Sequence, residues 1–222
     1  MNLKNWVVVF DLDDTLISEL EYQRSGIASV EAAITSIYGI AFDGHIQRAL
    51  DDGVKDIWAW ACQQLGLPPE VKTSLLWIYR LHSPNIKLFK GVEVLISRLL
   101  SYEAKLAILS DGRSITQRLK LRAIGLESLP LFISEECQSV KPQIDRFLSI
   151  ENKWPQCNYV YVADNSAKDF TAPRSRNWLT LGARWISPRV HYFSDQPRAG
   201  NQPDQWLDRP SMVLSVIASS CK

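Results

Sequence analysis

The sequence contains no long run of apolar residues. The first such run, Trp6 to Phe10, ends at Asp11 and is too short for a signal-peptide core or a membrane span. No other stretch approaches the roughly 18 apolar residues that a membrane-spanning helix needs. We therefore expect a cytoplasmic protein with no membrane partner.

An excess of charge of one sign is also missing. Lysine and arginine together number 25, and aspartate and glutamate number 24. This near balance gives no electrostatic reason to expect a nucleic acid partner.

The sequence lacks the residue spacings of zinc sites and disulfide frameworks as well. None of the 4 cysteines lies in a C-x-x-C pair, and the 3 histidines are scattered along the chain. This spacing favours reduced, incidental thiols. The cysteines are Cys62, Cys137, Cys157 and Cys221.

What is present is the composition of an ordinary globular protein, with 46% hydrophobic and 22% charged residues. A chain of 222 residues forms one large domain or two small ones and can bury a substantial core.

Runs of β-branched and aromatic residues alternate with helical patterns over most of the chain. Such alternation predicts an α/β fold, a Rossmann-like parallel sheet with helices on both faces. We expect strands at 6–10, 105–110, 131–133 and 159–163, and another within 178–186. We expect helices at 91–101, 114–124, 141–150 and 211–219, and an irregular loop over the proline-rich segment 187–210.

The segment between residues 19 and 83 is helical in pattern throughout. Ile27, Val30, Ile34 and Ile37 recur at helical spacing, and Gly39 follows as a C-terminal stop. No strand-like alternation interrupts the segment. We therefore predict a small helical domain at 17–87, inserted after the first strand into a core domain formed by 1–16 and 88–222.

Polar residues follow several of the predicted strands at the point where each strand ends. Asp11 and Asp13 follow the first strand, Ser110 ends the second, and Asp164 follows a later one. Ligands bind beyond the carboxyl ends of the strands in open parallel sheets, so these side chains can converge. Lys141, at the start of a predicted helix, can join them.

These residue types suit phosphoryl chemistry with Mg²⁺. Carboxylates bind this hard cation, and two acids spaced two apart in extended chain point to the same side. One of them can attack phosphorus while the other transfers a proton. The Ser110 hydroxyl and the backbone N–H groups of Asp111 and Gly112 can hold phosphoryl oxygens, and Lys141 offsets their charge.

Four sequence motifs resemble those of the haloacid dehalogenase superfamily. Asp11-Leu12-Asp13-Asp14-Thr15 resembles the first motif, D-x-D-x-T after a hydrophobic strand. Ile108 to Ser110 resembles the second, and Val140-Lys141-Pro142 the third. The segment from Val162 to Asp169 resembles the fourth, a strand followed by acids. Each motif is weak alone, but four in the family's order over residues 6–170 form a specific signal.

The resemblance implies a role for each matching residue. Asp11 is expected to be the nucleophile, forming an aspartyl-phosphate, and a magnesium ligand. Asp13 is expected to transfer the proton and to bind the metal through its carbonyl. The remaining implied roles are phosphoryl binding by Ser110 and Lys141, metal binding by Asp164, and supporting roles for Thr15 and Asp169.

Two features of the motifs refine this expectation. The dehalogenase branch lacks an acid at the position of Asp13, so this residue indicates phosphoryl transfer. Ala163 stands where many members have glycine, and Asn165 stands where some have a second acid, which leaves Asp164 and Asp169 as the acidic pair.

The helical insert occupies the place of the family's helical cap, with hinges near Ile17-Ser18 and Lys87–Lys90. Cap residues choose the leaving group, and the charged candidates are Arg24, His45, Lys55 and His82. The resemblance implies a magnesium-dependent phosphatase acting on a small phosphorylated metabolite, a sugar phosphate or a nucleotide. A phosphomutase, or a catalytically silent binding protein with this fold, remains the alternative.

Overall fold

The computed structural model describes residues 1–185 and 201–220. Its centre is a six-stranded sheet with the strand order β3-β2-β1-β4-β5-β6, in which every neighbouring pair is parallel. The strands are β1 (Trp6–Phe10), β2 (Lys105–Ser110), β3 (Leu131–Ile133), β4 (Asn158–Ala163), β5 (Leu179–Ala183) and β6 (Gln205–Leu207). The predicted Rossmann-like α/β fold is confirmed.

Alternate residues of the central strands face opposite sides of the sheet, as a period of two requires. Val8 and Phe10 of β1 pack into one hydrophobic cluster, whereas Val7 and Val9 pack into another. Both faces are therefore buried, which explains why the strands are almost continuously apolar.

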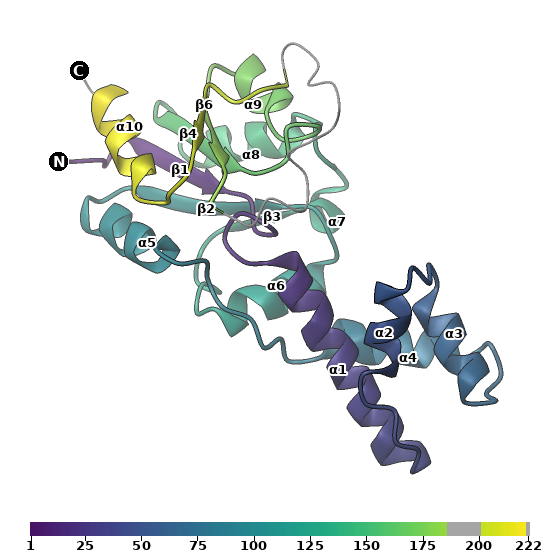
Figure 1. Ribbon diagram of the computed structural model, residues 1–222. Coiled ribbons are helices and arrows are strands. Elements are labelled where there is room, and N and C mark those ends of the chain that lie inside the picture. The colour runs from purple at the N-terminus through teal and green to yellow at the C-terminus, as the bar shows by residue number, and fades with distance from the viewer. Residues whose placement is uncertain (186–200, 221–222) are drawn as a thin grey trace.

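Helices cover both faces of this sheet (Figure 1). One cluster includes residues of α5, α6 and α10, and the other includes residues of α8 and α9. These helices are α5 (Val92–Ser101), α6 (Ser114–Ala123), α7 (Ser134–Cys137), α8 (Asp145–Lys153), α9 (Thr171–Ser175) and α10 (Met212–Ser220).

Two expectations for the core need correction. The predicted loop at 187–210 contains strand β6, which pairs with β5, although residues 186–200 lie outside the described part. The helix expected from Lys141 begins only at Asp145. Residues preceding a proline are disfavoured in helical geometry, and Val140 and Gln143 form a turn instead, in which the N–H of Gln143 donates to the Val140 carbonyl.

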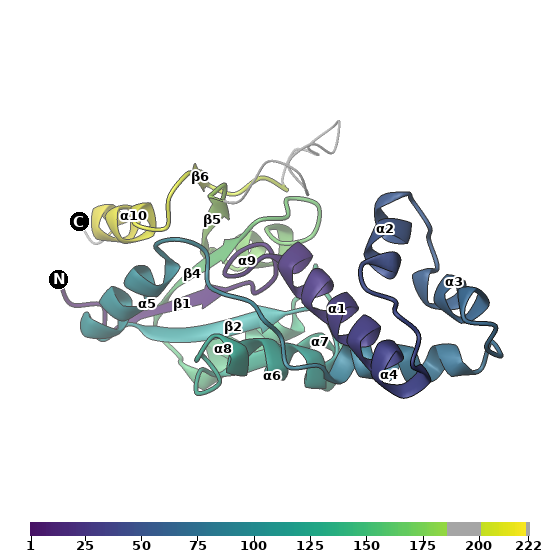
Figure 2. The same cartoon turned by 60° about the horizontal axis from the view of Figure 1, so that its bottom comes forward.

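Four helices, α1 (Glu19–Tyr38), α2 (His45–Asp51), α3 (Ile57–Gln64) and α4 (Val71–Leu81), form the helical insert. Figures 1 and 2 both show α2 and α3 far from the sheet and from the two termini. The insert has its own apolar cluster, which includes Ile27, Val30 and Ile34 of α1 and Leu75 of α4. Gly39 ends α1 in the left-handed conformation (φ 68°), as its position predicted.

The chain enters and leaves the insert at adjacent points of the core. Ile17 and Leu88 form an antiparallel bridge, and the N–H of Phe89 donates to the carbonyl of Leu16 at 2.8 Å. Ser18 then caps α1, because its side chain accepts a hydrogen bond from the N–H of Glu21. Within residues 1–185 and 201–220, no helix is long and apolar enough to cross a membrane.

Candidate active site

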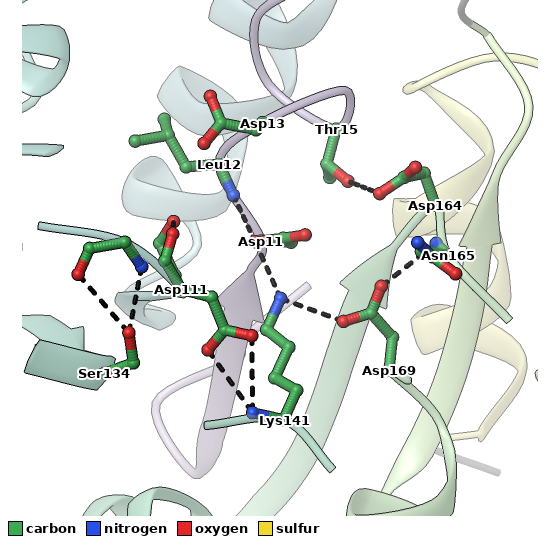
Figure 3. A network of polar contacts seen from close by, with 12 residues as sticks. Asp11, Leu12, Asp13, Thr15, Asp111, Ser134, Lys141, Asp164, Asn165 and Asp169 are labelled. Atoms are coloured by element: carbon green, nitrogen blue, oxygen red, sulfur yellow. Dashed lines mark hydrogen bonds and ion pairs between the residues drawn. The ribbon is translucent and has the colours of Figure 1, made fainter. Parts of the chain in front are cut away.

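The polar residues predicted to converge lie at the carboxyl ends of three neighbouring strands, β2, β1 and β4 (Figure 3). They surround a small pocket of about 40 Å³ that opens to solvent. Its lining consists of Asp11, Asp13, Asp14, Glu19, Ser110, Asp111, Asp164, Asn165 and Lys168. Asp11 and Asp13 thus share one pocket. Its lining contains six carboxylates in all and one lysine, Lys168.

Lys141 lies behind this lining, between two carboxylates. Its Nζ atom is 2.8 Å from Oδ1 of Asp11 and 2.8 Å from Oδ1 of Asp169 (Figure 3). Burial by itself would lower the pKa of this lysine, but Asp11 and Asp169 raise it well above the usual value. Lys141 therefore remains an ammonium ion at every physiological pH.

Asp11 is held through one of its two carboxylate oxygens. Oδ1 accepts a hydrogen bond from the N–H of Leu12 at 2.8 Å and also contacts Lys141. These contacts leave Oδ2 as the oxygen that can attack a substrate. Burial raises the pKa of Asp11 to about 6, although Lys141 works in the opposite direction.

Asp164 is a buried carboxyl group whose negative charge is not balanced by the positive charge around it. Burial is the main cause that raises its pKa to about 9, and the neighbouring Asp11 and Asp169 raise it further. The hydroxyl of Thr15 donates to Oδ1 of Asp164 at 3.4 Å, a long contact. A cation bound beside Asp11 and Asp164 would remove this excess of negative charge.

The geometry of the acidic residues fits such a cation. Ligand oxygens of Asp11, Asp164 and Asp169 all lie within 4.8 Å of one another. Among the described residues, Lys141 is the buried ammonium group that pairs with two of these carboxylates, those of Asp11 and Asp169. Asp169 is already engaged by Lys141, by the Tyr161 hydroxyl at 3.2 Å and by the N–H of Asn165 at 3.0 Å. Asp11 and Asp164 are therefore the better ligands, and an all-oxygen set suits Mg²⁺.

The carboxylate of Asp13 is held from the side by helix α6. Nζ of Lys120 lies 2.7 Å from Oδ1, and Nε2 of Gln117 lies 2.9 Å from Oδ2. The same Gln117 nitrogen donates to Oγ of Ser110 at 2.8 Å. Helix α6 thus connects the residues after β1 with the end of β2.

Residues of the loop after β2 that the sequence suggested for phosphate binding form hydrogen bonds within the protein. The N–H of Gly112 donates to Oγ of Ser134 at 2.9 Å rather than remaining free for a ligand. The carboxylate of Asp111 pairs with the buried Arg146 and accepts the N–H of Lys141 at 3.3 Å. Asp111 therefore positions the backbone of Lys141, and Ser110 and Asp111 line the pocket whereas Gly112 does not.

None of the four charged candidates in the helical insert lines the described pocket. Arg24, His45 and Lys55 are exposed, and the His45 ring stacks on Phe42 with centroids 5.0 Å apart. His82 is buried, with Nδ1 2.6 Å from the carbonyl oxygen of Tyr79. Burial lowers the pKa of His82, which favours a neutral ring.

Sequence reasoning missed several residues that the structure places in or beside the site. Gln117, Lys120 and Arg146 are buried beside it, and Glu19 and Lys168 line the pocket. The spacing of Gln117 and Lys120, three apart on a helix that follows Ser110, puts them on one face and was an available signal. Arg146 carried none, because a helical arginine is usually exposed.

Residues 8–182 match the haloacid dehalogenase-like hydrolase family. This match covers most of the chain, and the parallel sheet with acids at its carboxyl edge agrees with it. The chain belongs to the haloacid dehalogenase-like hydrolases. No protein in a search of curated sequences matches it.

Solved structures share the fold at low sequence identity. YfnB from Bacillus subtilis, solved with bound magnesium, is 16% identical over 96% of this chain and 99% of its own, with a TM-score of 0.65. A 2-haloacid dehalogenase from Pseudomonas syringae is 17% identical over 96% and 98%, with a TM-score of 0.64. A phosphatase from Thermococcus onnurineus is 20% identical over 95% and 97%, with a TM-score of 0.59.

Proposed function

We propose that the protein is a magnesium-dependent phosphomonoester hydrolase that works through an aspartyl-phosphate on Asp11. The observation that carries this proposal is the position of a second carboxyl group, Asp13, in the same pocket as Asp11. A nucleophile beside a proton-transferring acid suits phosphoryl transfer.

In the first step, Oδ2 of Asp11 attacks the phosphorus atom, and the bond between phosphorus and the ester oxygen breaks. Asp13 in its protonated form donates its proton to that oxygen, so an alcohol leaves. Lys141 offsets the negative charge that gathers around Asp11 during this step.

In the second step, Asp13, now a carboxylate, takes a proton from water. The resulting hydroxide attacks the phosphorus of the aspartyl-phosphate, the acyl phosphate bond breaks, and inorganic phosphate leaves. Asp11 is regenerated and Asp13 is protonated again, so the cycle closes without another reactant. Ser110, at the pocket wall, is placed to bind a phosphoryl oxygen.

Asp11 and Asp164 are the side chains that would hold Mg²⁺, and Asp169 would orient Lys141 beside them. The ion would supply positive charge to the phosphoryl oxygens as a Lewis acid. The crowded carboxylates support this assignment, as does the raised pKa of Asp164.

The test is phosphate release from a panel of phosphorylated sugars, nucleotides and small acids, with Mg²⁺ and with EDTA. Release that needs both Mg²⁺ and Asp11 is the expected result. Isomerised sugar phosphates without released phosphate would indicate a phosphomutase, which uses the same residues. No reaction with any compound would favour a catalytically silent protein, and release of halide from a 2-haloacid would favour a dehalogenase.

A further inference from the structure

Both oxygens of the Asp13 carboxylate have a donor from helix α6. Lys120 contacts Oδ1 and Gln117 contacts Oδ2, at 2.7 and 2.9 Å. The two donors are 5% and 2% exposed, whereas the Asp13 side chain is 20% exposed. The donors are thus inside the protein, and the carboxyl group that they hold opens toward the pocket.

Lys120 also contacts the helical insert. Its Nζ atom lies 4.2 Å from the centroid of the Tyr22 ring on α1, within the range of a cation–π interaction. The Tyr22 ring packs in turn against Tyr79 and His82, with centroids 5.9 and 5.0 Å away. One buried ammonium group therefore has a carboxylate of the core on one side and an aromatic group of the insert on another.

The position of Lys120 is constrained because a buried ammonium group is stable only beside groups that compensate its charge. Removing an ammonium group from water costs free energy unless a carboxylate or another electron-rich group compensates. Asp13 is the ion-pair partner of Lys120, and the Tyr22 ring is its cation–π partner. Moving either partner changes the position that is most favourable for the other.

We propose that Lys120 is a positioning residue for Asp13, and that its contact with Tyr22 makes the orientation of the Asp13 carboxyl group depend on the position of the helical insert. The inference rests on the proposed function, since it concerns the group that transfers the proton. Lys120 acts through Asp13, so its removal misaligns both proton transfers without removing a phosphate-binding group.

The test is a double-mutant cycle between Lys120→Met and Asp13→Asn, with p-nitrophenyl phosphate and Mg²⁺ as the assay. A positioned acid or base contributes about 10²- to 10⁴-fold to a rate, and misalignment forfeits part of this contribution. We expect Lys120→Met to lower kcat about 10- to 100-fold with little change in KM, and Lys120→Arg to restore most of kcat. In the Asp13→Asn background, Lys120→Met has no further effect.

Arg118→Met is the matched control. Arg118 is a cation of the same helix that pairs with the exposed Glu136 at 2.8 Å, outside the site. Its removal leaves kcat unchanged. Tyr22→Leu tests the contact with the insert, and we expect a smaller fall in kcat that disappears in the Lys120→Met background.

Three outcomes overturn the inference. They are an unchanged kcat in Lys120→Met, an equal loss in the presence and absence of Asp13, and no rescue by arginine. If Lys120→Met does not fold, as thermal unfolding would show, Lys120→Gln carries the same cycle. Absence of phosphate release from the wild-type protein overturns the proposed function itself, and that result appears before any variant is compared.

Discussion

The ammonium group of Lys141 lies 2.8 Å from the carboxylate of Asp11, and both side chains are almost completely buried. Because Asp169 lies at the same distance on another side of Lys141, one cation holds two carboxylates together. Replacing Lys141 by methionine leaves both acids without their counter-ion. Loss of one partner of a buried pair costs about 3–5 kcal/mol of folding free energy.

We therefore expect Lys141→Met to lower the free energy of unfolding by about 3–5 kcal/mol, as measured in urea. Lys4→Met, at an exposed lysine, is the control and should change it by less than about 0.5 kcal/mol. Equal stability of the two variants would show that Lys141 does not hold the carboxylates together.

Asp11→Asn should abolish turnover and leave the fold intact. Asparagine has nearly the same shape but cannot form the acyl phosphate, so kcat should fall at least about 10³-fold. The fold should tolerate the change because the amide oxygen can still accept the N–H of Leu12 and Lys141 keeps Asp169 as its ion-pair partner. The measurements are phosphate release and thermal unfolding. Retained activity would remove Asp11 as the nucleophile.

Without metal, the protein should lose stability as the pH rises from 5 to 9. The pKa of Asp11 is raised to about 6 and that of Asp164 to about 9, against an unperturbed value of 3.8. A carboxyl group with a raised pKa favours the folded state when protonated. Its contribution is complete below the unfolded pKa and is lost as the pH passes the folded pKa.

The check is the Tm in EDTA at several pH values, with Asp164→Asn as the matched variant. We expect the fall in Tm to be shallower in Asp164→Asn, because the amide does not ionise. Added Mg²⁺ should raise the Tm of the wild-type protein most at high pH, because the ion binds the carboxylate form. A slope of Tm against pH that is the same in both proteins would contradict the assignment of Asp164.

Gly26→Ala should destabilise the helical insert although alanine is the better helix former. A Cβ at Gly26 would lie 2.5 Å from the ring of Tyr79 on α4, too close for van der Waals contact. Alanine gains about 1 kcal/mol in helix propensity, and overpacking costs about 1–3 kcal/mol. We expect a net loss in thermal stability, whereas Ala28→Leu on the exposed side of α1 should be nearly neutral. A stabilised Gly26→Ala would show that the ring of Tyr79 moves away freely.

The sequence pattern was sufficient to predict those strands of the sheet that are buried on both faces. Trp6 to Phe10 is continuously apolar because both sides of β1 pack against helices. Strand β6 escaped prediction because it includes the polar Gln205 and lies in a proline-rich segment, whereas the equally short edge strand β3 is wholly apolar. The pairing of β6 with β5 comes from tertiary contact rather than from local preference.

The candidate site was predictable in part for a similar reason. Asp11, Ser110 and Asp164 each end or follow a recognisable strand, so topology alone brings them to one edge. Lys120 has only a weak local mark, its spacing of three from Gln117, because lysines on amphipathic helices usually face solvent. Its importance becomes visible only once α6 is packed beside Asp13.

The bridge between Ile17 and Leu88 also bears on how such a protein can change over time. Because the chain leaves the core and returns at paired residues, the two covalent connections of the insert lie side by side. Insertions, deletions or wholesale replacement of that segment would leave the register of the sheet and the spacing of its acids untouched. The inserted segment can thus diversify while the sheet stays fixed, provided that a new segment again supplies a partner for Lys120, as Tyr22 does here.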